Sequence, residues 1–324
     1  MCGICAFFDP ELKDKDCAIQ GMMDTIKHRG PSSDGKYTND QVALGFRRLS
    51  IIDLRGGSQP IFNEDKSRAI IFNGEIYNFK PLRKELIDAG HTFTTKADTE
   101  VLLHGYEEWG MDGLLKKVRG MFAFVIWDDN TKTLYGARDF FGIKPMYYSD
   151  QNGKLIVGSE LKSFLAYPGF KKELNTEAVK PYLMNQYNDL KETFFKGVYR
   201  FPAGHWFEYK DGKMKTHQYW DAKYVENSLS FEETLDKINE DLKETVDLYR
   251  NADVPVGAFL SEGIDSSYLT SLLDPEDVFS VSFDDSTYNE ASKAKALSDL
   301  HGWKFFADKV DADEAMRDFP EMQY

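Results

Sequence analysis

The first two thirds of the chain alternates short apolar runs with turn-forming residues, a pattern typical of β-strands. It predicts strands over Gly3–Phe8, Val42–Arg47, Ala69–Asn73, Gly120–Asp128 and Thr133–Arg138, and a β-hairpin of Phe201–Tyr209 and Lys213–Tyr219 around Asp211-Gly212. Apolar residues recur at helical spacing in Pro81–Ala89 and Thr99–Trp109, and Gly90 and Gly110 stand where C-terminal caps are needed. This part is therefore expected to be a strand-rich α+β domain.

The pattern changes at Ser230, which is predicted to form a capping box with Glu233 ahead of an amphipathic helix. Strands and helices then alternate, as is typical of a parallel sheet: strand Val256–Leu260, helix Ser266–Leu273, strand Val278–Phe283, helix Glu290–Leu300 and strand Trp303–Ala307. Because 324 residues exceed the usual size of one core, we place two domains at residues 2–220 and 228–324. The second is short and stops abruptly at Tyr324, so we expect the sequence to be a fragment.

Composition narrows the class of protein. The 54 acidic and 40 basic residues leave a net charge of −14, which repels phosphate backbones and argues against nucleic-acid binding. The three cysteines, Cys2, Cys5 and Cys17, are too few and too close to the N-terminus for a disulfide framework. No export signal and no apolar run of membrane-spanning length is visible, so we expect a cytoplasmic protein with no membrane partner.

Cys2 is the first candidate for chemistry. A lone cysteine is more often a small buried hydrophobe than a nucleophile, so its position alone is weak evidence. Cysteine is, however, small enough for Met1 to be removed from in front of it, and Gly3 is expected to leave the new terminus open to a substrate. A free α-amine, with an ordinary pKa near neutrality, could then act as general base to the adjacent thiol.

The neighbourhood of Cys2 resembles a known family. Five motifs in the same order resemble the class II glutamine amidotransferase domain: Met1-Cys2-Gly3-Ile4, His28-Arg29-Gly30-Pro31, Arg48 to Asp53, Asn73 to Asn78 and Asp98-Thr99-Glu100. Two further motifs, Arg138 to Tyr148 and Gly158 to Lys162, are similar to the form of that domain found in asparagine synthetases. The resemblance implies an N-terminal-nucleophile αββα sandwich, followed by a truncated α/β parallel-sheet domain that binds an adenine nucleotide.

The resemblance implies a role for each residue of a glutamine site. Cys2 would attack the carboxamide, and the Asn73 amide and the Gly74 N–H would stabilise the oxyanion, although Asn-Gly alone is more typical of a hairpin turn. Arg48 would bind the α-carboxylate and Asp98 the α-ammonium; the alternatives are a surface ion pair and an N-cap. The remaining glutamine-binding residues that it implies are Leu49, Ser50, Ile51, Ile52 and Glu75.

A second candidate site follows the predicted strand Val256–Leu260. The loop Ser261 to Ser267 resembles the pyrophosphate-binding loop of asparagine synthetases and related ATP pyrophosphatases, where backbone N–H groups and hydroxyls at a helix start bind phosphates. ATP would contact Phe259, Ser261, Gly263, Asp265, Ser266 and Val281, and Asp265 would hold Mg²⁺. The family has glycine in place of Glu262, which adds a negative charge beside the phosphates and restricts a backbone position that is left-handed in some loops.

The function that these resemblances imply is glutamine-dependent asparagine synthesis. Ammonia released from glutamine at Cys2 would aminate aspartate that ATP and Mg²⁺ have activated as β-aspartyl-AMP. One alternative keeps the glutaminase but changes the nitrogen acceptor. Another is a glutamine-binding regulatory or partner protein with a degenerate second domain, motivated by Glu262 and the short C-terminus. The sequence leaves open whether two copies form a homodimer.

Overall fold

The structure is a computed structural model that describes residues 1–283 and 290–323. Tyr324, where the sequence analysis placed the end of a fragment, lies outside the described residues. The chain divides into two compact units, Met1–Tyr224 and Val225–Tyr324. Each unit is described by itself below.

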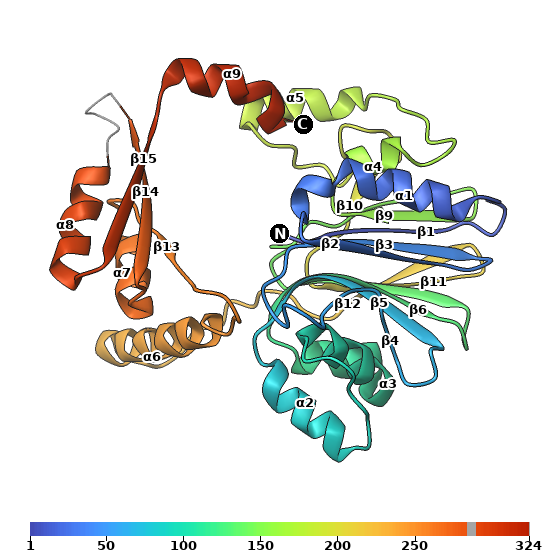
Figure 1. The fold of residues 1–324 in the computed structure, drawn as a ribbon, viewed down its shortest axis with the longest axis horizontal. Coiled ribbons are helices and arrows are strands. Elements are labelled where there is room, and N and C mark those ends of the chain that lie inside the picture. The colour runs from blue at the N-terminus through green and yellow to red at the C-terminus, as the bar shows by residue number, and fades with distance from the viewer. Residues whose placement is uncertain (284–289, 324) are drawn as a thin grey trace. The chain divides into compact units, whose positions relative to one another are not determined.

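The first unit contains two six-stranded antiparallel sheets (Figure 1). The first sheet has the order β10 (Tyr199–Arg200), β8 (Tyr147–Gln151), β9 (Lys154–Gly158), β1 (Gly3–Phe8), β3 (Val42–Arg48) and β2 (Ser33–Thr38). The second has the order β12 (Lys213–Gln218), β11 (His205–Lys210), β7 (Thr133–Arg138), β6 (Gly120–Asp128), β5 (Arg68–Ile76) and β4 (Ile61–Phe62). The predicted strands are confirmed, whereas β2, β4, β8, β9 and β10 were not predicted.

Helices cover the outer face of each sheet, so this unit has four layers (Figure 1). Helices α1 (Lys15–Thr25) and α4 (Lys162–Leu165) pack on the first sheet, and α2 (Phe79–Asp88) and α3 (Asp98–Lys117) pack on the second. The helix α5 (Val179–Asn185) lies in the connection between β9 and β10. The two sheets bury a shared core between them, to which β1 contributes Ile4, Ala6 and Phe8.

Gly110 interrupts the predicted helix Thr99–Trp109 as expected, because its φ of 65° is non-helical, and a second helical stretch, which was not predicted, follows to the end of α3 at Lys117. The buried residues Leu114 and Leu115 then hold the second part of the helix on the sheet. The first hairpin strand begins at His205 rather than Phe201, because the Phe201 carbonyl accepts a hydrogen bond from the Arg138 guanidinium (2.6 Å).

The second unit is built on a parallel sheet, as predicted. Strand β14 (Asp277–Phe283) lies between β13 (Ala258–Phe259) and β15 (Lys304–Val310), and both neighbours run parallel to it. Helices α6 (Phe231–Tyr249), α7 (Ile264–Leu273), α8 (Ala291–His301) and α9 (Ala312–Gln323) accompany the sheet. Strand β13 is shorter than the predicted Val256–Leu260, and α9 was not predicted.

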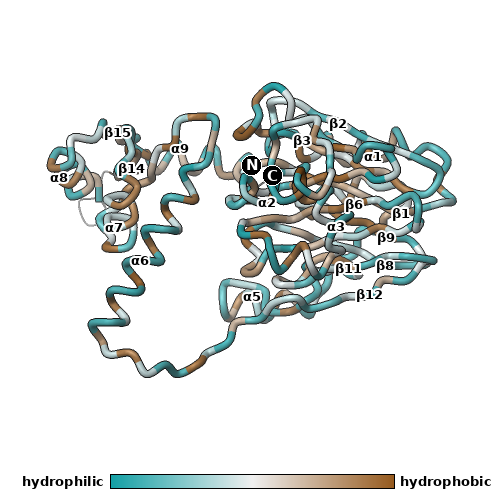
Figure 2. The backbone as a smooth tube through the Cα atoms, turned by 90° about the horizontal axis from the view of Figure 1, so that it is seen from below, coloured by the Kyte–Doolittle hydropathy of each residue, from teal (hydrophilic) through white to brown (hydrophobic). Residues whose placement is uncertain are grey.

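The predicted capping box at the start of α6 is confirmed. The Ser230 hydroxyl accepts a hydrogen bond from the Glu233 N–H (3.2 Å), and the Glu233 carboxylate accepts one from the Ser230 N–H (2.8 Å). Hydrophobic and hydrophilic residues alternate along α6 (Figure 2). None of the helices within residues 1–283 and 290–323 is both long and apolar enough to cross a membrane.

The core between the two sheets offers a test of what stabilises the first unit. Ile71 is fully buried there, so Ile71→Ala should lower the free energy of unfolding by about 2–5 kcal/mol through lost burial and a residual cavity. Ile87→Ala, which truncates a half-exposed side chain on α2, should change it by less than about 0.5 kcal/mol. Urea unfolding followed by circular dichroism measures both, and equal effects would contradict this assignment of the core.

Candidate active site

The backbone of Cys2 is fixed by motifs that lie far away in the sequence. Arg29 donates from Nε to the Cys2 carbonyl (2.9 Å) and from its terminal nitrogen to the Glu160 carboxylate (2.9 Å). The strand that follows Cys2 is also fixed, because the Ile4 N–H donates a hydrogen bond to the Ser159 hydroxyl (3.0 Å). The motifs around Arg29 and Glu160 therefore position the start of β1, and with it the thiol.

The Cys2 thiol lines a small pocket. Burial raises the pKa of the thiol above its ordinary value, and the Leu49 N–H, which donates to Sγ at 3.3 Å, acts in the opposite direction. Gly3, which was expected to leave the new terminus open to a substrate, is buried and is not among the residues that line the pocket. A side chain at Gly3 would meet Ile26 (2.8 Å) and Arg29 (3.2 Å), so Gly3 instead allows close packing.

Most of the predicted glutamine-binding residues line this pocket. The lining residues that the sequence analysis named are Cys2, Arg48, Leu49, Ile51, Ile52, Gly74, Glu75 and Asp98. It missed Phe46, Gly57, Gln59, Phe72, Ala97 and Thr99. Ser50 and Asn73 are not among the lining residues, and the Ser50 N–H instead faces the Ser32 hydroxyl at 3.4 Å.

Asn73 and Gly74 lie within strand β5, paired with β6, and do not form the hairpin turn that Asn-Gly alone favours. The Asn73 side chain is buried, and its Nδ2 has no hydrogen-bond partner within residues 1–283 and 290–323. An unpaired buried amide is costly unless a ligand satisfies it. Gly74 has no room for a side chain, because a Cβ there would lie 2.1 Å from the Met121 carbonyl oxygen.

Arg48 does not form the surface ion pair that was its alternative role. Its side chain is buried, and one terminal nitrogen donates to the carbonyl oxygens of Ile52 (3.1 Å) and Asp53 (2.7 Å). Gly57 packs against the same guanidinium and has no room for a side chain, because a Cβ there would lie 2.6 Å from an Arg48 nitrogen. The loop that follows β3 therefore folds around Arg48 and holds its charge at the pocket.

Asp98 is the first residue of α3, whose N-cap is Ala97, so the alternative N-cap role for Asp98 is wrong. Its carboxylate instead accepts a hydrogen bond from the Ile76 N–H (2.8 Å). Burial, followed by the charge of Asp98, raises the pKa of Glu75 to about 8, and burial also raises the pKa of Asp98. Two neighbouring carboxylates that resist ionisation together form a site suited to a cation.

Lys144 is a charged residue of this region that the sequence analysis did not single out. Lys144 is buried, and burial lowers the pKa of its ammonium. The charges of Glu75 and Cys2 act in the opposite direction and offset part of this effect. Asp139 holds the loop that carries Lys144, because the Asp139 carboxylate accepts from the N–H groups of Ile143 (2.8 Å) and Lys144 (2.9 Å). Lys144 lies within the motif from Arg138 to Tyr148, so this motif could have pointed to it.

The predicted nucleotide loop precedes α7 in the second unit. The Ser261 and Ser266 hydroxyls are hydrogen-bonded to one another (2.8 Å), and the Gly263 N–H donates to the Ser261 hydroxyl (3.1 Å). Gly263 is the N-cap of α7 and, in the part of the chain that the structure describes, no side-chain cap bond is formed there, so the first N–H groups of the helix can face an anion. Asp265 lies in the first turn, and Phe259 and Val281 lie on the adjacent strands β13 and β14 with exposed side chains.

The structural concern about Glu262 is not supported. Glu262 is not among the described residues with positive φ, so a side chain causes no backbone strain at that position. Its carboxylate forms an ion pair with Lys293 on α8 (2.7 Å), which offsets its charge. Ordinary side chains are thus compatible with this loop.

Comparison with known proteins identifies the class of protein. The model of the glutamine amidotransferase domain family matches residues 1–220, and the chain belongs to this family. The asparagine synthase family model matches residues 237–324, which confirms the second resemblance found in the sequence.

The particular relatives agree with this assignment. The chain is 37% identical to asparagine synthetase [glutamine-hydrolyzing] 1 of Bacillus subtilis (strain 168), over 99% of this chain and 52% of that protein. It is 34% identical to amidase chry2 of Gibberella zeae, over 84% of this chain and 43% of that protein. The chain thus spans about half the length of the curated relatives it matches.

One solved structure has a similar fold. The allosteric regulatory enzyme of purine biosynthesis matches with a TM-score of 0.50 and 15% identity, covering 98% of this chain and 69% of that chain. At this identity the match describes the fold alone.

The carboxylate pair in the pocket predicts a pH dependence of stability. A carboxyl whose folded pKa is raised keeps a proton that the unfolded chain releases, so stability is lost as pH rises from the ordinary value near 4.5 to about 8. Glu75→Gln removes this loss and should be more stable than the parent by roughly 1–2 kcal/mol at pH 8, after allowance for solvent screening, and equal to it at pH 4.

Chemical denaturation at the two pH values measures the difference. Glu177→Gln, a change at an exposed carboxylate outside the pocket, should leave the parent's pH dependence unchanged. Equal pH profiles for Glu75→Gln and the parent would show that the pair does not titrate together.

Proposed function

We propose that this chain is the glutaminase domain and the first part of the synthetase domain of a glutamine-dependent asparagine synthetase. Residues 2–220 form the glutaminase domain, and residues 228–324 begin the ATP-pyrophosphatase domain. The observation that carries this proposal is the Cys2 thiol at a pocket that also presents Arg48, Glu75 and Asp98, with the unpaired amide of Asn73 in the adjoining strand. The four-layer arrangement of the first unit, which matches the N-terminal-nucleophile αββα sandwich, supports it.

The pocket's charges favour a free amino acid. Arg48 is held by backbone carbonyls and by no carboxylate within the described ion pairs, so its charge remains available to the α-carboxylate of glutamine. The α-ammonium neutralises the pair of Glu75 and Asp98, whose joint ionisation is costly without a cation. Leu49, Ser50, Ile51 and Ile52 form the loop that closes beside the substrate.

The chemistry is acyl transfer through a thioester. Once Met1 is removed, the α-amine of Cys2 accepts the thiol proton and the sulfur attacks the carboxamide carbon. The negative charge that develops on the carbonyl oxygen is stabilised by the Asn73 amide and the Gly74 N–H. The carbon–nitrogen bond breaks, the nitrogen takes the proton and leaves as ammonia, and water then hydrolyses the thioester to give glutamate and the free thiol.

The second unit supplies residues that fit ATP and Mg²⁺. The uncapped start of α7 with Ser261, Gly263 and Ser266 suits a pyrophosphate chain, and Phe259 and Val281 suit the adenine. The Asp265 carboxylate, together with phosphate oxygens, provides the oxygen ligands that Mg²⁺ prefers. In the complete protein ATP would activate aspartate as β-aspartyl-AMP with release of pyrophosphate, and ammonia would displace AMP to form asparagine.

A second candidate keeps the glutaminase and changes the acceptor. Its support is the similarity to a relative named as an amidase, at nearly the identity shown by the asparagine synthetases. A non-catalytic second domain that only regulates or binds a partner is less favoured, because Glu262, one of its two motivations, neither strains the loop nor lacks a counter-ion.

Removal of the nucleophile is the direct test of the glutaminase. Cys2→Ala should abolish glutamate release from glutamine, because no thioester can form, while the circular dichroism spectrum and unfolding midpoint stay unchanged. Cys17→Ala, a change at an exposed thiol on α1, should retain full activity. Equal glutamate release by the parent and Cys2→Ala would rule out Cys2 as the nucleophile.

The fate of the ammonia is tested by product analysis with the full-length protein. Glutamine, aspartate, ATP and Mg²⁺ together should yield glutamate, asparagine, AMP and pyrophosphate in equal amounts. Asp265→Asn should lower AMP formation by at least about tenfold, because a charged metal ligand is lost, and leave glutamate release intact. Glutamate release without AMP in the parent would contradict asparagine synthesis and favour a different acceptor.

A further inference from the structure

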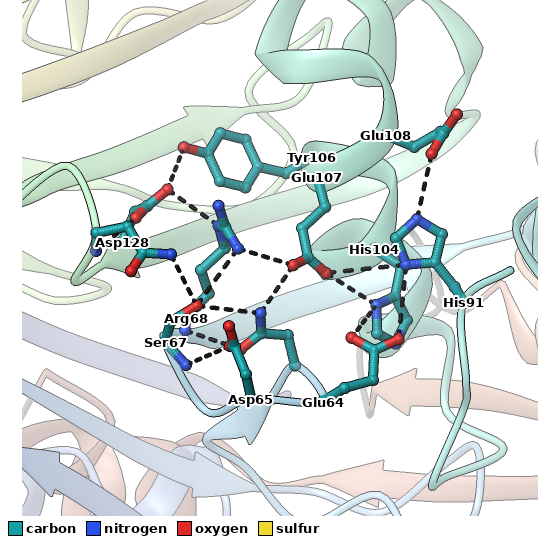
Figure 3. Close-up of polar contacts among 12 residues, drawn as sticks. Glu64, Asp65, Ser67, Arg68, His91, His104, Tyr106, Glu107, Glu108 and Asp128 are labelled. Atoms are coloured by element: carbon teal, nitrogen blue, oxygen red, sulfur yellow. Dashed lines mark hydrogen bonds and ion pairs between the residues drawn. The ribbon is translucent and has the colours of Figure 1, made fainter. Parts of the chain in front are cut away.

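Four side chains that play no part in the glutamine site converge beside helix α3. Two of them, His104 and Glu107, stand one turn apart on α3; Glu64 comes from the loop between β4 and β5, and His91 from the connection between α2 and α3. Figure 3 shows the two imidazoles and the two carboxylates turned toward one another. Their potential ligand atoms all lie within 4.8 Å of one another.

The separations between these atoms suit one ion. His104 Nδ1 lies 3.0 Å from a Glu107 oxygen and 3.7 Å from a Glu64 oxygen, and His91 Nδ1 lies 3.7 Å from Glu64 and 4.0 Å from Glu107. Ligands about 2.0–2.1 Å from a tetrahedral zinc ion are about 3.3–3.4 Å apart, and the observed values straddle this distance. Small side-chain rotations therefore suffice to close a four-ligand shell.

The second ring nitrogen of each imidazole faces a carboxylate, as it usually does in metal-binding histidines. His91 Nε2 lies 3.4 Å from a Glu108 oxygen, and His104 Nε2 lies 3.7 Å from a Glu100 oxygen. His104 is 1% exposed, and this Nε2 has no hydrogen-bond partner within residues 1–283 and 290–323. The His104 ring is thus fixed in a buried position with Nδ1 directed at the cluster.

The carboxylates are also oriented from outside the cluster. One oxygen of Glu107 accepts from Asn63 Nδ2 (2.7 Å) and Arg68 (2.9 Å), which leaves the other oxygen facing His104 (Figure 3). One oxygen of Glu64 accepts from the Thr92 N–H (2.9 Å), in the loop that carries His91. Both carboxylates are therefore held with an oxygen toward the shared space.

We infer that Glu64, His91, His104 and Glu107 form a structural site for one divalent transition-metal ion, of which Zn²⁺ is the best fit. Two imidazoles favour a transition metal over Mg²⁺ or Ca²⁺, which prefer oxygen ligands alone. Four protein ligands fill a tetrahedral shell, and a filled shell stabilises structure and leaves no position for a substrate. The two carboxylates balance the charge of the ion.

The ion joins three separate segments of the first unit. It ties the β4–β5 loop and the α2–α3 connection to α3, whose first residue is Asp98 of the glutamine pocket. The connection itself is already organised by Glu100, whose carboxylate accepts from the N–H groups of Thr94 (2.7 Å) and Thr95 (2.7 Å). Metal binding adds an anchor at His91, near the start of this connection, whereas Asp98 of the pocket follows its end.

The test is a zinc titration of the full-length, untagged protein after chelator treatment. Cys2→Ala and Cys17→Ala are introduced together, so that no accessible thiol competes for zinc. Calorimetry should show saturable binding of one Zn²⁺ per chain, and zinc should raise the thermal unfolding midpoint, because the ion binds only the folded site. Mg²⁺ in excess should not displace it.

Two ligands with solvent-accessible side chains allow substitution without loss of the fold. In this background, His91→Ala and Glu64→Gln should each weaken zinc binding by at least about tenfold, the loss that even supporting contacts of metal sites produce. His301→Ala and Glu85→Gln, which change an exposed histidine in the second unit and an exposed glutamate on α2, should leave it unchanged. The assignment would be overturned if the protein bound no zinc, if His91→Ala and Glu64→Gln bound it as tightly as their background, or if Mg²⁺ displaced it. The cluster would then be a network of ion pairs alone.

Discussion

The first unit depends on the burial of its N-terminal strand in the middle of a sheet. Strand β1 pairs with β3 on one side and β9 on the other, and its residues alternate between the core beneath α1 and the core between the sheets. Arg29 and Glu160 hold the carbonyl of Cys2 at the point where this strand begins. A residue at a chain terminus, where motion is normally greatest, thus acquires a defined position.

The pocket beside this strand, and the strand β5 that adjoins it, carry buried polar groups that are costly to leave without a partner. The Asn73 amide is buried without a partner among the described residues, and Glu75 and Asp98 oppose one another's ionisation. Each feature lowers the stability of the empty site. In the proposed reaction the same features would become favourable contacts to an oxyanion and an ammonium group, so that free energy would be recovered on binding.

Helix α3 connects this pocket to the rest of the unit. Its first residue, Asp98, faces the pocket, and its second and third turns carry the histidine and glutamate of the second cluster. Gly110 then redirects the helix so that Leu114 and Leu115 remain on the sheet. Packing, hydrogen bonding and, in the proposed site, metal coordination all act on the orientation of this one helix.

The sequence alone determined the strands that are short apolar runs between turn-forming residues, the capping box at Ser230 and the parallel order of the second sheet, because these follow from local patterns and short-range hydrogen bonds. It also indicated Cys2, Arg48, Gly74 and Asp98, because spaced motifs carried them. Only the tertiary structure decided what surrounds these residues: that Arg29 and Glu160 meet, that Asn-Gly lies in a strand, and that Glu64 and His91 approach α3. Such contacts join residues far apart in the chain, and no local pattern specifies them before the sheets and helices have packed.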